Sequence, residues 1–315
     1  MRAMQSDRYG GPEVLREVEL PDPVPGPAQL LLRVETASVN PVDWKRMSGK
    51  MRLLMPVRFP AVPGFDVAGV VEALGPGVVG FAVGDRVHAR LRDPGGACAT
   101  KVVADVGVSA RMPDGMGWDE AAGLPLAGMT ALQGLRDQLE LPMTGATERV
   151  LVVGASGGVG HLAVQLARAA GAHVVGVCSG RNAELVRSLG AHEVVDYTAQ
   201  DAFAGQAPFD VIYDCIGGGR LGEWTARLTP TGRYATPMPG GSAILRQLLN
   251  PVCGRKVRAV MLDANAADLE TLDRLYADGQ LKVVVDQRFP LPQLAEAWRA
   301  SIAGRTRGKL VIDVA

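Results

Sequence analysis

The sequence predicts an α/β protein with two parts, a small β-rich, barrel-like domain and a doubly wound parallel sheet. Three observations predict this fold class. Short β-type runs separated by close turns fill residues 1 to about 115. From about residue 119, apolar strand-like runs alternate with helical segments. A glycine-rich loop joins the first of these later strands to the helix that follows it.

Composition narrows the class of protein. The chain has 315 residues, enough for two domains that each bury a core. Its 33 Lys+Arg residues equal its 33 Asp+Glu residues, so no net charge attracts nucleic acid or an anionic membrane. The N-terminus has no apolar signal segment, and no apolar run reaches the roughly 20 residues of a membrane span. We therefore expect a cytoplasmic protein without a nucleic-acid or membrane partner.

The β-rich part contains several runs of strand-forming residues, separated by turns at 75–77 and 83–85. The predicted strands are 30–39, 66–74, 85–90 and 99–104. Close spacing of short strands is typical of a small barrel.

The second part alternates strands and helices. An apolar helix is expected over 121–135 despite its internal proline. The predicted series then runs strand 149–154, helix 160–171 ending on Gly171, strand 173–178 and helix 182–190, with further strands in 192–197, 209–217, 232–237 and 256–262. After residue 263, helix 268–279 leads into the segment 281–291, and helix 291–304 and a final strand 309–314 follow. This tail is expected to return to the first domain. The predicted domains are 1–118, 119–263 and the returning segment 264–315.

The segment between strand 149–154 and its helix carries the strongest chemical signal. It consists of Gly154-Ala155-Ser156-Gly157-Gly158-Val159-Gly160. Small residues let the backbone approach a pyrophosphate, whose charge is stabilised by the helix N-terminus. The pattern A-x-G-x-x-G is weak alone, but its strand–loop–helix–strand context indicates a dinucleotide site.

The end of the second strand distinguishes NAD from NADP. NAD enzymes usually place an acidic residue there, where it accepts from the ribose 2′-hydroxyl. This chain has Ser179 and Arg181 instead. A hydroxyl and a guanidinium suit a 2′-phosphate, although Arg181 by itself resembles any solvated arginine at a helix start. The missing acid favours NADP(H).

Several motifs resemble the zinc-free quinone oxidoreductase-like and alkenal/enone reductase branch of the medium-chain dehydrogenase/reductase superfamily. They lie in residues 37–50, 63–87, 121–132, 154–160, 185–197 and 308–314. The resemblance implies a GroES-like catalytic domain, a Rossmann cofactor domain, a small-molecule enone or quinone substrate, and a homodimer.

The same resemblance implies a set of site residues. Asn40 and Thr130 would lie near the nicotinamide, and Lys45 is a further candidate donor to the substrate carbonyl. For Lys45, a solvated lysine paired with Asp43 is the competing interpretation. The implied cofactor-binding residues are Asn40, Thr130, Ser156, Gly157, Gly158, Val159, Ser179, Arg181, Tyr197, Ile216, Gly217 and Lys309. By itself, Tyr197 would be interpreted as a half-buried core tyrosine.

The zinc-dependent relatives place Cys where this chain has Asn40, and a His-Glu pair where it has Phe65-Asp66. They also carry a clustered four-cysteine zinc loop. Here the cysteines and histidines form no ligand-spaced set, and each histidine is interpreted as an ordinary surface or strand-end residue. They are Cys98, Cys178, Cys215, Cys253, His88, His161, His173 and His192. No metal site is therefore expected.

What remains is hydride chemistry without a metal. The expected reaction adds a hydride from NADPH to the β-carbon of an α,β-unsaturated carbonyl, or reduces a quinone. The final proton comes from a donor that the sequence does not identify. Three alternatives stay open: one-electron quinone reduction, an enoyl-thioester reductase with a basic rim, and a non-catalytic NADPH-binding redox sensor or structural protein. The candidate rim is Arg246, Arg255, Lys256 and Arg258.

Overall fold

The computed structural model describes residues 1–199, 206–217, 221–250 and 256–315. These residues form two compact units. Unit 1 contains Met1–Leu126, Ala264–Asp278 and Lys282–Ala315. Unit 2 contains Ala127–Asp263 together with Gly279–Leu281. Predicted features at Cys253 and Arg255 lie outside the described residues.

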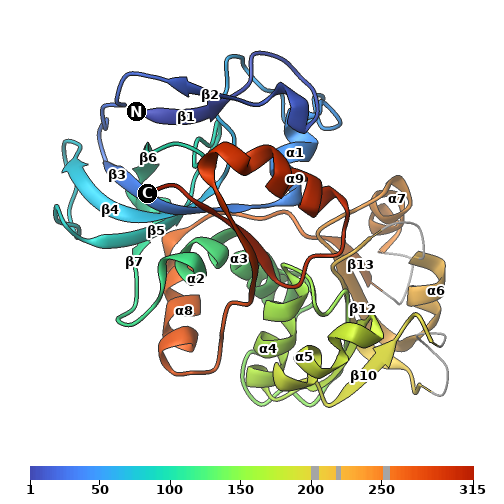
Figure 1. Ribbon diagram of the computed structural model, residues 1–315. Helices are drawn as coiled ribbons and strands as arrows, with labels where there is room; N and C mark the ends of the chain where they lie inside the picture. The colour runs from blue at the N-terminus through green and yellow to red at the C-terminus, as the bar shows by residue number, and fades with distance from the viewer. Residues whose placement is uncertain (200–205, 218–220, 251–255) are drawn as a thin grey trace. The chain divides into compact units, whose positions relative to one another are not determined.

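Unit 1 is built on a mainly antiparallel sheet with β3 at its centre (Figure 1). Its strand order is β14-β15-β3-β4-β5-β7, and β6 also pairs with β3. The strands of the unit are β1 (Arg2–Gln5), β2 (Arg16–Glu19), β3 (Gln29–Val39), β4 (Asp66–Leu74), β5 (Arg86–Arg90), β6 (Lys101–Asp105), β7 (Ser109–Arg111), β14 (Val285–Pro290) and β15 (Lys309–Asp313). Thus the last strand of the chain pairs with one of the first.

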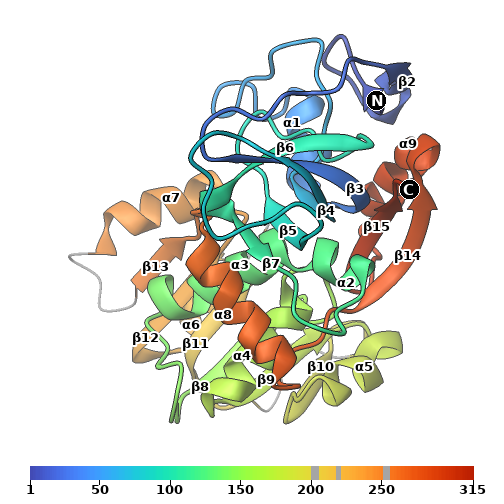
Figure 2. The same ribbon diagram turned by 90° about the vertical axis from the view of Figure 1, so that its left-hand side faces the viewer.

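The core of unit 1 combines the two ends of the chain. Leu30 and Leu32 of β3 pack in one buried cluster with Leu310 and Ile312 of β15 and with Trp298. The helices are α1 (Pro41–Met47), α2 (Trp118–Gly123), α8 (Ala266–Ala277) and α9 (Leu294–Ile302). Figure 2 shows α8 beside β7, which it contacts. The C-terminal segment therefore belongs to the same core as the N-terminal strands.

The predicted single helix over 121–135 is wrong. The structure has two helices, α2 and α3 (Pro125–Gln133), followed by a π-helical turn at Gly134–Gln138. Pro125 begins α3 rather than interrupting one long helix, because a proline lacks the N–H that an interior helical position needs.

Unit 2 contains a wholly parallel six-stranded sheet in the order β10-β9-β8-β11-β12-β13. The strands are β8 (Arg149–Val153), β9 (His173–Cys178), β10 (Glu193–Asp196), β11 (Phe209–Asp214), β12 (Leu228–Thr236) and β13 (Lys256–Ala259). Counted from the first strand, this is the order 3-2-1-4-5-6 of dinucleotide-binding sheets. The order reverses between β8 and β11.

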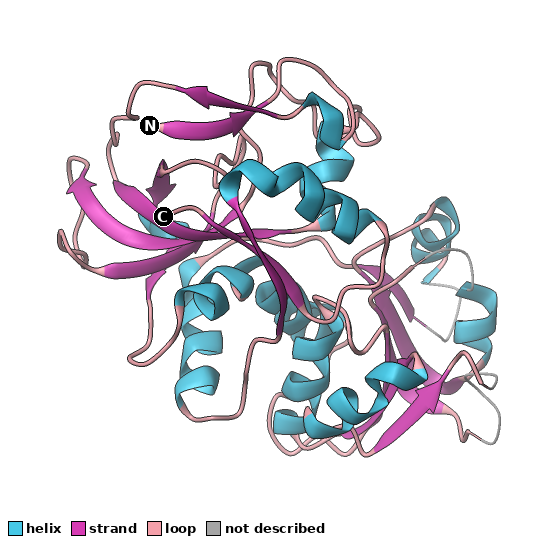
Figure 3. Cartoon of the chain, in the orientation of Figure 1, coloured by secondary structure: helices cyan, strands magenta, loops and turns pink. Residues whose placement is uncertain are grey.

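Helices cover the parallel sheet, as Figure 3 shows by colour. They are α4 (Gly160–Ala170), α5 (Ala183–Ser188), α6 (Leu221–Ala226) and α7 (Gly241–Leu248). As predicted, Gly171 terminates α4 as its C-cap residue, and its φ of 103° is the left-handed conformation that glycine adopts without strain. The predicted strand 256–262 is shorter in the structure, where β13 ends at Ala259. None of the helices in the described part of the chain has the length and apolarity needed to cross a bilayer.

The predicted fold class is confirmed: a β-rich unit accompanies a doubly wound parallel sheet.

Candidate functional site

The glycine loop lies at the carboxyl end of β8, where the strand order of unit 2 reverses. Gly154 has a φ of +73°, which a side chain would strain. A Cβ on Gly160 would lie 2.1 Å from the carbonyl oxygen of Gly154. Both positions therefore require glycine, and together they produce the tight strand-to-helix turn of a pyrophosphate loop.

Asn182 ties this loop to the end of the neighbouring strand β9. Its Nδ2 donates to Ser156 Oγ at 2.9 Å and lies 3.4 Å from Ser179 Oγ. Its own Oδ1 is buried without a hydrogen-bond partner in the structure. An unsatisfied buried acceptor beside a glycine loop fits a site that a polar ligand completes. Sequence reasoning did not single out Asn182.

The other side of the switch point is formed after β11. Asp214 Oδ1 accepts from the backbone N–H groups of Ile216 and Gly217, at 3.0 and 2.9 Å. Asp214 Oδ2 accepts from the hydroxyl of Tyr234, whose pKa is raised by burial and by this carboxylate. Ile216 is 62% exposed and lies over Gly154, close enough that a Cβ there would collide with it. Asp214, which the sequence analysis missed, thus holds two predicted cofactor residues.

The end of β9 carries the predicted 2′-phosphate residues. Arg181 is exposed, and Ser179 is half-buried. Tyr197 is 59% exposed, so the interpretation of it as a core tyrosine is wrong. Asp196 at the end of β10 faces the backbone of Gly180, where a Cβ would meet its Oδ2 at 2.3 Å. Hydrogen bonds, chiefly from Thr198, lower the pKa of Asp196.

Asn40 belongs to unit 1, where it joins a buried polar cluster at one end of three central strands, β15, β3 and β4. Its Nδ2 donates to Asp66 Oδ2 at 2.8 Å, and its Oδ1 accepts from Lys309 Nζ at 2.6 Å. Asp66 also accepts from Ser38 Oγ at 3.1 Å and from the backbone N–H of Leu126 at 3.0 Å. Burial lowers the pKa of Lys309, while Asp66 and Asp43 oppose that effect.

Strand register explains this cluster. Ser38 lies opposite Asp66 in β4 and opposite Val311 in β15. Because side chains two residues apart point to the same face, Asn40 and Lys309 lie on the same face as Ser38 and Val311. Three neighbouring strands therefore deliver an amide, a carboxylate and an ammonium to one point.

Asp43 supports the backbone of Asn40. Its Oδ2 accepts from the Asn40 N–H at 2.7 Å, at the start of α1. Its Oδ1 is buried with no hydrogen-bond partner in the structure. Burial raises the pKa of Asp43 to about 7, with a smaller contribution from Asp66. This carboxyl is therefore far easier to protonate than an exposed aspartate.

The remaining predicted residues lie in different places. The Lys45 ammonium is half-buried and lies 5.4 Å from the centre of the Trp44 ring. Burial, and to a smaller degree Lys50, lowers the pKa of Lys45. Thr130 lies in unit 2, where its carbonyl accepts from the Tyr213 hydroxyl at 2.7 Å. Gly158 and Val159 complete the loop before α4.

Comparisons with known proteins agree with both units. The alcohol dehydrogenase GroES-like domain model matches residues 26–134, and the zinc-binding dehydrogenase model matches residues 189–312. The chain is 38% identical over 323 residues to a chloroplast envelope quinone oxidoreductase homolog of Arabidopsis thaliana, covering 99% of this chain and 98% of that protein. The chain belongs to the quinone oxidoreductase-like family of medium-chain dehydrogenases/reductases.

Two further relatives of the quinone oxidoreductase-like family bear on the chemistry. The chain is 32% identical over 330 residues to a 2-methylene-furan-3-one reductase of Solanum lycopersicum, covering 99% of this chain and 79% of that protein. The crystal structure of Escherichia coli quinone oxidoreductase complexed with NADPH matches with a TM-score of 0.85 and 25% identity, covering 100% of both chains. The predicted family is confirmed.

One family model is named for zinc, but the buried cluster around Asn40 does not fit that metal. The buried cluster presents an amide and a carboxylate with a lysine ammonium beside them, 2.6 Å from Asn40 and 3.6 Å from Asp66. An ammonium has no lone pair to donate, and its charge repels a cation. Among the described residues, no group of three His, Cys, Asp or Glu side chains is placed to hold a metal ion.

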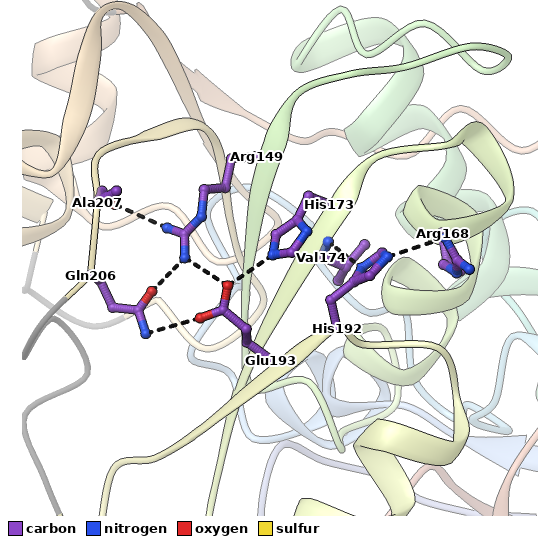
Figure 4. Close-up of polar contacts among 8 residues, drawn as sticks. All are labelled: Arg149, Arg168, His173, Val174, His192, Glu193, Gln206 and Ala207. Carbon is purple, nitrogen blue, oxygen red and sulfur yellow. Dashed lines mark hydrogen bonds and ion pairs between the residues drawn. The ribbon is translucent and has the colours of Figure 1, made fainter.

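The histidines differ from the prediction. His88 and His161 are fully buried, so the interpretation of all four as ordinary surface or strand-end residues is wrong. His88 Nε2 lies 3.1 Å from Asp273 Oδ2. His173 and His192 stack at 4.5 Å on the parallel sheet, as part of a polar cluster with Arg149, Glu193 and Arg168 (Figure 4). Glu193 holds His173 and is itself held by Arg149, while Arg168 contacts His192. These contacts account for the positions of both histidines without a ligand.

Asp43 yields a prediction of pH dependence. Its folded pKa, about 7, lies above its ordinary value of 3.8, so the folded state binds this proton more tightly than the unfolded chain does. The free energy of unfolding should therefore fall as pH rises from about 4 to about 7. In Asp43→Asn this contribution disappears, and the variant should gain on the wild type by up to a few kcal/mol over that range.

Denaturant titrations at several pH values measure this difference, with exposed Asp114→Asn as the matched control. A constant difference between Asp43→Asn and the wild type from pH 4 to 7 would contradict the assignment.

Proposed function

We propose that this protein is an NADPH-dependent, zinc-independent reductase that transfers a hydride to the C=C bond of an α,β-unsaturated carbonyl or to a quinone. One observation carries the proposal. The chain has a dinucleotide-type glycine loop in unit 2, and in unit 1 a buried cluster of an amide (Asn40), a carboxylate (Asp66) and an ammonium (Lys309) that cannot serve together as metal ligands. An oxidoreductase that binds a nicotinamide cofactor and uses no metal needs a reaction in which the cofactor does the difficult chemistry.

The relatives support the same direction. One is named for quinone oxidoreduction and one for the reduction of a methylene-furanone, and a structural neighbour was solved with NADPH. The phosphate-binding part would consist of Ser156, Gly157, Gly158 and Val159, with Ile216 and Gly217 beside it. Ser179, Arg181 and Tyr197 would hold the 2′-phosphate, and Asn40, Thr130 and Lys309 would serve the nicotinamide end.

Bound NADPH supplies a hydride, and the protein supplies binding, orientation and charge. As the double bond is reduced, negative charge develops on the carbonyl oxygen of the substrate. Asn40 and Lys45 are the side chains we assign to donate hydrogen bonds to that oxygen, because donors in a dry site stabilise developing charge strongly. In its protonated form the half-buried Lys45 has the three donors of an ammonium.

The enoyl-thioester alternative has less support. Its basic rim would need free cations for the phosphates of a carrier. Lys256 Nζ instead lies 3.3 and 3.2 Å from the two carboxylate oxygens of Glu140. Arg255 lies outside the described residues. The sensor alternative predicts tight NADPH binding without turnover.

We also propose that the protein is a homodimer formed through β13. This strand ends the order of the parallel sheet, so in the described part its outer edge has no neighbouring strand. The adjacent helix α7 exposes Ile244, Leu245 and Leu248, at 52, 62 and 72%. An unpaired strand edge beside an apolar helix face is what a second copy can cover by a two-fold contact.

The first prediction from the proposed function concerns the reaction. Purified protein should oxidise NADPH in the presence of 2-enals, enones or quinones, measured by loss of absorbance of the reduced cofactor, and an enone should give the saturated ketone. Prior treatment with a metal chelator should leave the rate unchanged. NADPH binding without turnover on the whole panel would favour the sensor, and zinc-stimulated alcohol oxidation would refute metal independence.

The second prediction concerns the choice of cofactor. In Arg181→Ala the KM for NADPH should rise about tenfold to hundredfold while the KM for NADH changes little, because a charge-assisted contact with the 2′-phosphate is lost. Arg187→Ala removes a neighbouring exposed arginine and is the matched control. Equal losses with both cofactors would show that Arg181 does not read the 2′-phosphate.

The third prediction concerns assembly. Analytical ultracentrifugation should give a dimer for the wild type and a monomer for Leu248→Asp, because a carboxylate in the apolar contact would be desolvated without a partner. Leu53→Asp, at a side chain that is 93% exposed in unit 1, should remain a dimer. A wild-type monomer at micromolar concentration would refute the interface.

A further inference from the structure

Asn40 occupies the position at which an asparagine normally caps a helix. It directly precedes α1, where a side-chain oxygen usually accepts from the backbone N–H two or three residues later. Here the Asn40 side chain makes other contacts: Nδ2 donates to Asp66 and Oδ1 accepts from Lys309. Asp43 instead supports this helix start by accepting from the Asn40 backbone. The Asn40 side-chain amide therefore does not cap helix α1.

The two partners of Asn40 have opposite and exclusive hydrogen-bonding character. An ammonium can only donate, and a carboxylate can only accept. A flipped Asn40 amide would place its NH₂ group against the Lys309 ammonium and its oxygen against the Asp66 carboxylate, and both contacts would be repulsive. The pair therefore allows one amide orientation and leaves one N–H and one oxygen lone pair of Asn40 uncommitted.

The packing around the cluster preserves this arrangement. Asp66 is completely buried and Lys309 is 3% exposed. Asp66 is held by Ser38 Oγ and the Leu126 N–H. The stem of Lys309 passes over Gly123, where a Cβ would lie 3.4 Å from Lys309 Cγ and 2.8 Å from Val283 Cγ1. A glycine at residue 123 therefore gives the lysine room to reach the amide.

Stability alone does not account for such a pair. Two buried opposite charges contribute little more, and often less, than apolar side chains of the same volume, because removing them from water is costly. We propose that Lys309 and Asp66 are positioning residues that hold the Asn40 amide in one orientation, so that its remaining N–H and lone pair meet the bound reactants in a fixed geometry. This inference rests on the proposed function, in which Asn40 contacts the reactants.

The orientation itself is tested without turnover. In ¹⁵N-labelled apoprotein, the Asn40 side-chain NH₂ signal, identified by its loss in Asn40→Ala, should appear as one set with a slowly exchanging proton. In Lys309→Met and in Asp66→Asn it should broaden, split or exchange faster. Lys101→Met removes another lysine of unit 1 that contacts two carboxylates, and it should leave the signal unchanged. An unaltered Asn40 signal in both cluster variants overturns the proposal.

Kinetics then test whether Lys309 acts through Asn40. With an enone or quinone that the wild type reduces, Lys309→Met and Asn40→Ala should each lower kcat/KM about tenfold to hundredfold. The double variant should be no slower than Asn40→Ala, because the amide to be oriented is then absent. Multiplying losses would mean that Lys309 acts independently and would overturn the proposal. Should Lys309→Met fail to fold, Lys309→Gln replaces it, since glutamine both donates and accepts and does not impose an orientation.

The two tests separate this inference from the proposed function. Absence of turnover by the wild type on every enone and quinone defeats the proposed function, while the amide spectrum still decides the orientation. If the wild type turns over a substrate but the Asn40 signal is unchanged in both Lys309→Met and Asp66→Asn, only the inference is overturned.

Discussion

The antiparallel pairing of β15 with β3 is the constraint on which unit 1 and its polar cluster depend. It places Leu310 opposite Val39 in a core that both ends of the chain build. Side chains alternate along a strand, so a slip of one residue would carry Leu310 out of this core to the opposite face, where Val311 is buried, and would move Lys309 to the other face of the sheet. Burial of the apolar residues of β15 therefore selects the same register that brings the lysine to Asn40. The stability of the core and the geometry of the cluster share one cause.

In unit 2 the corresponding constraint is the close approach of backbone at the switch point of the sheet. Gly154 and Gly160 admit no side chain, and Ile216 covers the first of them. Asp214 fixes the segment after β11 through two backbone N–H groups and is itself held by Tyr234. A rigid loop on one side and a tethered segment on the other reduce the conformational entropy that a dinucleotide would have to remove on binding.

Local features were predictable from the sequence, and long-range partnerships were not. The strand–loop–helix of residues 149–171 was predictable because its strand pattern, glycines and helix end are contiguous. The division into α2 and α3 at Pro125 was not predicted, because apolar residues continue without interruption from one helix into the next. The bond from Asn182 to Ser156 and the stacking of His173 on His192 depend on strand neighbours, which no spacing in the chain reveals. The resemblance suggested Lys309, but only the register identifies its partners.

The cluster around Asn40 breaks local rules that the rest of unit 1 obeys. The side chain of Asn40 does not cap the helix that it precedes, and Asp43 retains a buried oxygen without a partner in the structure. In addition, the charges of Lys309 and Asp66 lie in a region where apolar groups pack. Each departure costs stability. Sequences under selection for folding alone remove such conflicts, and those that persist concentrate at functional sites. Because all three converge on the surroundings of one amide, the energetic argument singles out the same side chain as the family resemblance, from independent premises.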